Sequence, residues 1–168
     1  MNRWRRNLPG MAAIAVLLAS TGTATARDSL GVFDRWAAFR DPSPLRCYAI
    51  SAPVRAGDNG QWRPFAAIGS WPGQGARGQF HIRLSLARSH NAQVTLSVGA
   101  RRFELVASDA DAWAQDARTD AAIVAAMRAS RSMSVEALSR TGKPFADVYA
   151  LRGAATAIDA AALGCLRR

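Results

Sequence analysis

The chain has 168 residues, with 22 Lys and Arg against 12 Asp and Glu, and a formal net charge of +10. Its composition, 49% hydrophobic and 8% aromatic, is typical of a folded globular protein and excludes a disordered chain. The two cysteines and two histidines lack the number and spacing of a structural zinc site. The length fits one domain and excludes an enzyme with a separate cofactor domain.

Residues 1–26 are predicted to be a signal peptide. Three arginines precede a short apolar core at 11–19, and residues 24–26 (ATA) have the small-x-small pattern of a cleavage site. An N-terminal anchor is disfavoured, because a spanning helix needs roughly 18 apolar residues. Cleavage after Ala26 leaves 27–168 as a single domain, with the net charge reduced to +7 by the loss of three arginines. We therefore expect a periplasmic or secreted, envelope-associated protein with no transmembrane segment after cleavage.

Export makes a disulfide the simplest use of the two cysteines. Cys47 lies near the start of the exported domain, and three residues follow Cys165. In an oxidising compartment, such a pair predicts one disulfide. Because the bond closes nearly the whole domain, the chain-entropy model values it at up to roughly 5 kcal/mol. The alternative, a nucleophilic Cys47–His81 pair, has no third residue in an obvious orienting role.

Strand patterns dominate the first two-thirds of the chain. An aromatic stretch at 33–39 is followed by a turn, and residues 45–51 and 65–71 form apolar runs on either side of a loop rich in Gly, Asp and Asn. Residues 79–87 alternate most cleanly. The apolar face of that segment consists of Phe80, Ile82, Leu84 and Leu86. The polar face consists of His81, Arg83 and Ser85.

Residues 94–106 are predicted to form a hairpin. Gly99 and Ala100 suit a two-residue type II′ turn, whose first central position requires positive φ. This register pairs apolar with apolar and polar with polar residues, as Val94–Leu105, Leu96–Phe103, Thr95–Glu104 and Ser97–Arg102.

The last third predicts a helix, a second hairpin and a C-terminal helix. Thr119 is the expected cap of the first helix, whose apolar stripe is Ile123, Val124 and Met127. The hairpin at 132–151 is expected to turn at Thr141-Gly142. Its predicted apolar face is Met133, Val135 and Ala137 against Ala146, Val148 and Ala150. The predicted inward stripe of the last helix is Leu151, Ala155, Ile158, Ala162 and Cys165. Together these elements predict a mainly β fold, an antiparallel β-sandwich with two short helices.

The two-residue turn would place Glu136 opposite Asp147. Facing carboxylates separate acid and base roles in many hydrolases, but like charges across a sheet also destabilise it, or a neighbouring arginine could satisfy both. His81 and His90 lack converging partners at a recognised spacing, and the tryptophans at 36, 62, 71 and 113 fit core packing better than a ligand groove. No catalytic or cofactor motif occurs, so we predict a non-enzymatic protein without a cofactor or metal.

The basic excess is almost entirely arginine, with Lys143 as the only lysine. Arginine binds phosphate and carboxylate in a planar, two-pronged way. For an exported protein this favours an anionic envelope partner, such as lipopolysaccharide, phospholipid or a cell-wall polymer, over nucleic acid. The alternative is that the arginines are spread over a solvated surface, which the absence of long basic runs in 27–168 favours.

A series of motifs runs through residues 27–168, namely Trp36-x-x-Phe39, Cys47-Tyr48, Val94-Thr95, Val98-Gly99, Phe103-x-Leu105, Ala112-Trp113, Ile123-Val124-x-Ala126-Met127, Met133-x-Val135, Asp147-x-Tyr149-x-Leu151-x-Gly153 and Cys165. With these motifs the chain resembles the invasion-associated locus B proteins of alphaproteobacteria. The resemblance implies an immunoglobulin-like sandwich in the cell envelope, with a binding or structural role. It implies host contact only if the organism is a pathogen, and it carries over no catalytic residue, cofactor or ligand. A small envelope hydrolase using Glu136 and Asp147 is the alternative function.

Overall fold

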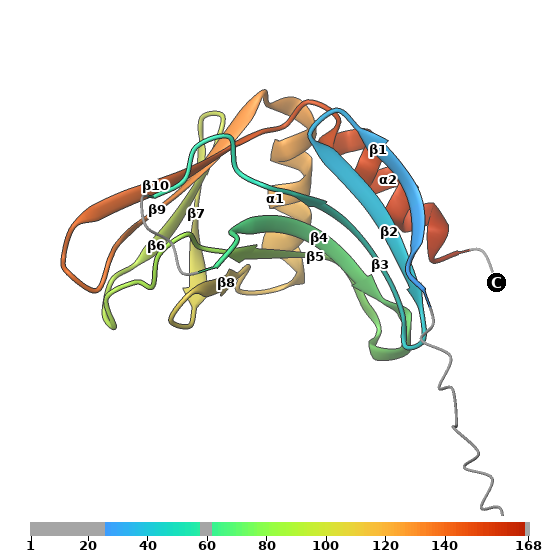
Figure 1. The fold of residues 1–168 in the computed structure, drawn as a ribbon, viewed down its shortest axis with the longest axis horizontal. Helices are drawn as coiled ribbons and strands as arrows, with labels where there is room; N and C mark the ends of the chain where they lie inside the picture. The colour runs from blue at the N-terminus through green and yellow to red at the C-terminus, as the bar shows by residue number, and fades with distance from the viewer. Residues whose placement is uncertain (1–25, 58–61, 167–168) are drawn as a thin grey trace, which may run out of the picture.

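The computed structural model describes residues 26–57 and 62–166, and the predicted signal peptide lies outside these residues except for Ala26. Ten antiparallel strands form one sheet in the order β1-β2-β3-β4-β5-β8-β7-β6-β9-β10. Figure 1 shows how strongly this sheet curves. The strands are β1 (Asp28–Phe33), β2 (Trp36–Pro42), β3 (Leu45–Ser51), β4 (Phe65–Trp71), β5 (Ala76–Arg83), β6 (Val94–Val98), β7 (Arg101–Ala107), β8 (Asp111–Trp113), β9 (Ser132–Leu138) and β10 (Pro144–Ala150).

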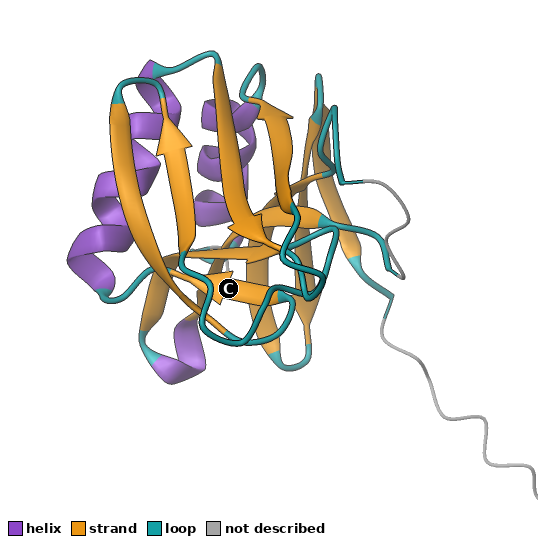
Figure 2. Ribbon diagram, turned by 90° about the vertical axis from the view of Figure 1, so that its left-hand side faces the viewer, coloured by secondary structure: helices purple, strands orange, loops and turns teal. Residues whose placement is uncertain are grey.

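Helices α1 (Ala117–Ala129) and α2 (Ala154–Gly164) lie against the sheet, and a short 3-10 helix, η1 (Pro72–Gln74), links β4 to β5. The helices α1 and α2 are seen beside the strands in Figure 2. α2 packs on β1 to β4, whereas α1 packs on β5 to β7. The prediction of a mainly β, antiparallel, sandwich-like domain with two short helices is confirmed.

One apolar core joins the two halves of the sheet and the helices. Its largest fully buried side chains are Trp36, Tyr149, Phe80, Ile82, Leu84 and Leu96. The halves are also tied by backbone hydrogen bonds, because the chain leaving β3 runs along the outer edge of β10. There the Val54 N–H donates to the Val148 carbonyl at 2.7 Å, and the Val148 N–H donates to the Arg55 carbonyl at 2.7 Å. The edge of β10 is therefore partly covered rather than open to another strand.

Several local predictions match the structure residue for residue. The predicted strands at 45–51 and 65–71 are β3 and β4. The β6–β7 hairpin has the predicted register, with Leu96 opposite Phe103 and Val94 opposite Leu105, and Gly99 has a φ of 57° in its turn. Here a glycine at the first turn position and matched faces on both strands specify the same register.

The helix predictions need two corrections. Asp116, not Thr119, caps α1, since its carboxylate accepts a hydrogen bond from the Thr119 N–H at 2.7 Å. The buried side of α2 consists mainly of Ala154, Ala157, Ile158 and Ala161, and the predicted stripe residue Ala162 is exposed. A helix composed largely of alanine has little contrast between its faces, so periodicity alone could not fix its rotation.

The predicted disulfide is confirmed. Cys47 and Cys165 are bonded, with their Cα atoms 5.7 Å apart. Cys47 lies on the core side of β3, and Cys165 is the C-cap residue of α2. The bond therefore fixes the end of the last helix to β3.

Candidate functional site

A hollow of about 770 Å³ lies where the chain after β3, the end of β5 and the β9–β10 turn meet, and we call it the cationic groove. Its rim carries three basic side chains, Arg55, Arg140 and Lys143, all exposed. None of the described residues that line it is acidic. The remaining lining residues are small, polar or apolar, namely Ala56, Gly57, Trp62, Ser85, Leu86, Ala87, Ser139, Thr141, Pro144, Phe145 and Ala146.

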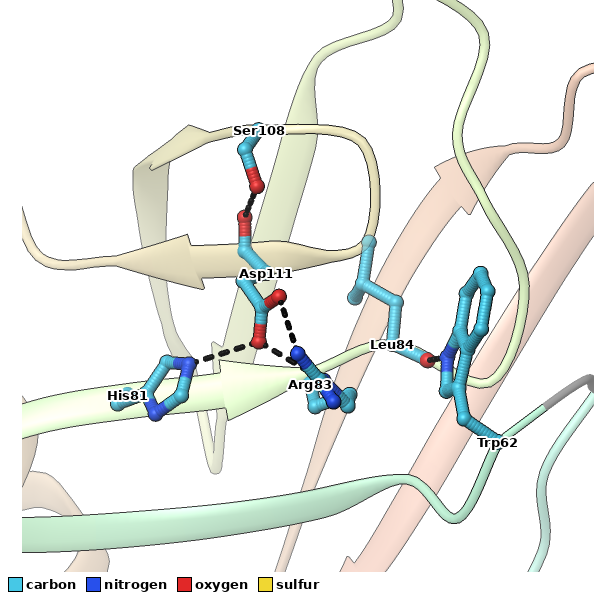
Figure 3. A network of polar contacts seen from close by, with 6 residues as sticks. All are labelled: Trp62, His81, Arg83, Leu84, Ser108 and Asp111. Atoms are coloured by element: carbon cyan, nitrogen blue, oxygen red, sulfur yellow. Dashed lines mark hydrogen bonds and ion pairs between the residues drawn. The ribbon is translucent and has the colours of Figure 1, made fainter.

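Trp62 gives the groove an aromatic wall with a fixed orientation. Its indole Nε1–H donates to the carbonyl of Leu84, one residue beyond β5, as Figure 3 shows. The ring is half-buried, so part of its surface remains available to a ligand. An apolar wall beside a few placed charges is the usual composition of a small-molecule site.

Asp147 holds the walls of the groove together from within the fold. Its side chain is completely buried, and its two carboxylate oxygens accept hydrogen bonds from the backbone N–H groups of Ser85 at 2.8 Å and Gly57 at 3.1 Å. The Gly57 N–H also donates to the Ser85 hydroxyl at 3.0 Å. A polar side chain buried in this way is tolerated only when hydrogen-bond donors satisfy it, and through these bonds Asp147 helps to fix the segment that carries Arg55.

The predicted Glu136–Asp147 pair does not exist in this fold. Asp147 is opposite Val135, whereas the exposed Glu136 is opposite Ala146, so the two carboxylates lie on different faces of the sheet. The β9 half of the predicted apolar face is confirmed, since Met133, Val135 and Ala137 are buried. The β10 half is wrong for the same reason as the carboxylate pair, because its inward residues are Phe145, Asp147 and Tyr149 rather than Ala146, Val148 and Ala150.

The cause is the length of the β9–β10 turn. The Ser139 N–H donates to the Lys143 carbonyl at 2.8 Å, which leaves three residues in the loop instead of two. Gly142, with a φ of 75°, occupies the left-handed position that ends such a loop. One additional loop residue shifts the pairing by one and exchanges the faces of the paired strand. The same loop places Arg140 and Lys143 on the rim.

A second polar cluster lies beside the groove, on the sheet face away from the helices. Asp111 on β8 accepts from His81 Nε2 at 2.9 Å and from two nitrogens of Arg83, at 3.1 and 2.9 Å (Figure 3). The His81 ring stacks on Trp113, with centroids 5.1 Å apart, and meets the Phe65 ring edge-on. Burial by itself would raise the pKa of Asp111, but the hydrogen bonds from Arg83 and His81 outweigh it and hold that pKa below its usual value.

The cluster is therefore a structural network at the junction of β5 and β8. Arg83 is committed to Asp111 and is not free to bind a ligand. In the described part of the chain no three His, Cys, Asp or Glu side chains are grouped to hold a metal ion. His90 lies elsewhere, and its carbonyl accepts a hydrogen bond from Arg88.

The lowered pKa of Asp111 predicts an acid-dependent loss of stability. Asp111→Asn is expected to reduce the free energy of unfolding by about 1 kcal/mol at pH 7. Because the folded-state pKa lies below the unfolded value of about 3.9, the wild-type advantage is present above that pH and is lost as pH falls through the folded pKa. Denaturant unfolding at several pH values measures both curves. The exposed neighbour Asp109, changed to Asn, should cost less than about 0.5 kcal/mol. A difference between Asp111→Asn and wild type that does not change with pH would contradict the prediction.

The tryptophans do not converge on one site. Trp36 is buried in the core and donates to the Ala150 carbonyl at 2.9 Å, while Trp113 stacks on His81. Trp62 alone among the described tryptophans lines the cationic groove. The sequence does not predict the cationic groove. The run Arg140-Thr141-Gly142-Lys143 places two cations around a predicted turn, but nothing in the sequence indicates that Arg55, in a distant loop, lies beside them.

No described helix is long and apolar enough to cross a membrane. No family model matches the chain, and no significantly similar protein was found among the curated proteins or the solved structures.

Proposed function

We propose that this is an exported protein of the cell envelope, of the invasion-associated locus B type, that binds an anionic ligand in the cationic groove. The signal-peptide pattern, the disulfide and the residues shared with that family support export. Binding rather than catalysis is supported by the hydrogen bonds that already occupy the two carboxyl groups near the groove. The oxygens of Asp147 accept hydrogen bonds from backbone N–H groups. Those of Asp111 accept from Arg83 and His81.

The observation that carries the proposal is the distribution of positive charge around one hollow. Many arginines are already neutralised, because in the described part of the chain aspartates hold seven of them in ion pairs. These are Arg27, Arg40, Arg46, Arg83, Arg128, Arg140 and Arg152. Arg88 is likewise committed, since its guanidinium donates to several backbone carbonyls.

Arg55 and Lys143 have no such ion pair among the described residues, and both face the groove together with the aromatic wall of Trp62. A guanidinium and an ammonium at the rim of a concave site suit a phosphate or carboxylate group. Lipopolysaccharide, phospholipid head groups and acidic cell-wall polymers all present such groups in the envelope.

The test measures binding of the purified protein to vesicles of phosphatidylglycerol, to lipopolysaccharide and to an acidic cell-wall polymer, with phosphatidylcholine vesicles as the neutral reference. The double variant Arg55→Ala, Lys143→Ala is expected to weaken binding to the preferred anionic probe at least tenfold. The matched control Arg118→Ala, Arg131→Ala removes the same charge from exposed positions that do not line the groove, and should change binding less than twofold.

Equal weakening by both double variants would mean that net charge alone attracts the ligand, and would refute the groove. Wild-type binding should also decrease as salt increases, because exposed charges are screened. Export is tested separately by the mass of protein recovered from the periplasm, which should begin at Arg27.

A further inference from the structure

A second hollow, of about 350 Å³, lies between α1 and α2 above β3 and β4, and we call it the apolar slot. It exists because α1 and α2 pack on different strands and present small side chains to each other. The lining is mostly apolar, and its described residues include no carboxylate. They are Cys47, Ile68, Ser70, Pro72, Arg77, Gly78, Ala117, Ala121, Val124, Ile158, Ala161, Ala162, Cys165 and Leu166.

An irregularity in β5 brings one cation to this slot. Strict alternation from the buried Phe80 would place Arg77 on the sheet face away from the helices. The β4–β5 pairing instead shifts between Gly69 and Trp71, and Gly78 adopts a φ of 63° while its N–H donates to the Ser70 hydroxyl at 3.0 Å. Bulges of this kind redirect side chains, and here Arg77 becomes part of the slot.

The slot is open space rather than a packed interior. A Cβ atom placed on Gly78 would meet no atom within 4 Å. Arg77 is exposed and has no ion pair among the residues that the structure describes, and Leu166, 65% exposed, extends the apolar lining outwards. An apolar cleft with one uncompensated cation at its rim is complementary to a molecule with an apolar tail and an anionic head.

We infer that the apolar slot binds the chain of one fatty acid, with the carboxylate at Arg77. The volume is near the lower limit of small-molecule sites, which suits a single chain rather than the two chains of a phospholipid. A guanidinium pairs with a carboxylate through two parallel hydrogen bonds, so Arg77 provides orientation as well as charge. The slot shares no lining residue with the cationic groove, so variants of one site leave the other intact.

Three ligands separate the contributions of tail and charge. Dodecanoate, below its micelle concentration, is expected to bind the purified protein, as measured by titration calorimetry. Dodecanol has the same chain without the charge and should bind at least tenfold more weakly. Acetate has the charge without the chain and should show no binding at the same concentrations.

Two variants block the slot from opposite walls. Ala121 on α1 and Ala162 on α2 are exposed and line the slot, so Ala121→Phe or Ala162→Phe fills it without disturbing the core. Each is expected to weaken dodecanoate binding at least tenfold. Ala125→Phe is the matched control, because Ala125 is exposed on α1 outside the slot, and its affinity should stay within twofold of wild type.

Arg77→Gln tests the head-group contact. It should lower the affinity for dodecanoate to that for dodecanol while leaving dodecanol binding unchanged. Unchanged melting temperatures show that the variants are folded. The inference is overturned if dodecanoate does not bind the wild-type protein, or if both blocked variants bind it as wild type does.

Discussion

Replacing both cysteines, as Cys47→Ala with Cys165→Ala, is expected to lower the free energy of unfolding by about 4 kcal/mol. The bond joins residues 118 positions apart, so its loss greatly increases the conformational entropy of the unfolded chain. In the folded state it also releases the end of α2 from β3. Because domains of this size are stable by only about 5–15 kcal/mol, this is a large fraction of the total.

Guanidinium unfolding of the double variant and of the oxidised wild type measures the difference. The reduced wild type is the internal control, because it lacks the bond but keeps both side chains. It should unfold close to the double variant. A double variant within about 1 kcal/mol of the oxidised wild type would show that the disulfide does not limit the unfolded chain as proposed.

Asp147→Ala is expected to destabilise the protein by about 3 kcal/mol, because it leaves the buried N–H group of Ser85 without its acceptor. The Gly57 N–H then keeps only its hydrogen bond to the Ser85 hydroxyl. The same change removes one of the links between β10 and the segment that carries Arg55, which then keeps only its backbone pairing with Val148, so binding in the cationic groove should weaken as well. Denaturant unfolding measures the loss of stability. Hydrogen exchange should locate the loosened attachment of the segment, with faster exchange at the amides of Gly57 and Ser85.

Glu136→Ala is the matched control for this variant. Glu136 lies on the neighbouring strand and is exposed, so its removal should change stability by less than about 0.5 kcal/mol. If the two variants have equal stabilities, the buried carboxylate is not the link between the segment after β3 and the hairpin. Asp147→Asn should lie between wild type and Asp147→Ala, since its amide oxygen retains acceptor capacity for one of the two N–H groups.

Structure prediction from sequence succeeded where neighbouring residues contain the necessary information. The β6–β7 hairpin is specified by Gly99 and by matched faces on both strands, and both lie within 13 residues of sequence (94–106). The strands β1 and β8 are not predicted from the sequence. β8 has only three residues, too few alternating positions to stand out from a loop. β1 has six residues, but its turn into β2, where Phe33 pairs with Trp36, lies inside the aromatic stretch at 33–39, so that stretch shows no boundary between the two strands.

The two proposed binding surfaces depend on features that are not local in the sequence. The cationic groove combines Arg55 with Lys143, which are distant in sequence and meet because the chain after β3 pairs with β10. The apolar slot depends on a bulge that reverses the side of the sheet on which Arg77 lies. Neither the pairing of the chain after β3 with β10 nor the bulge in β5 produces a periodic pattern that could be recognised in the sequence.

The sequence by itself determined the strand-rich character, several strand bounds and the pairing of the two cysteines, because alternation and cysteine count are properties of the chain alone. Only the tertiary structure decided which face of β10 is buried. A single additional residue in the turn before it moved Asp147 into the core and left Glu136 in solvent. Since side chains alternate with a period of two, a one-residue difference in loop length reverses every inward and outward assignment that follows.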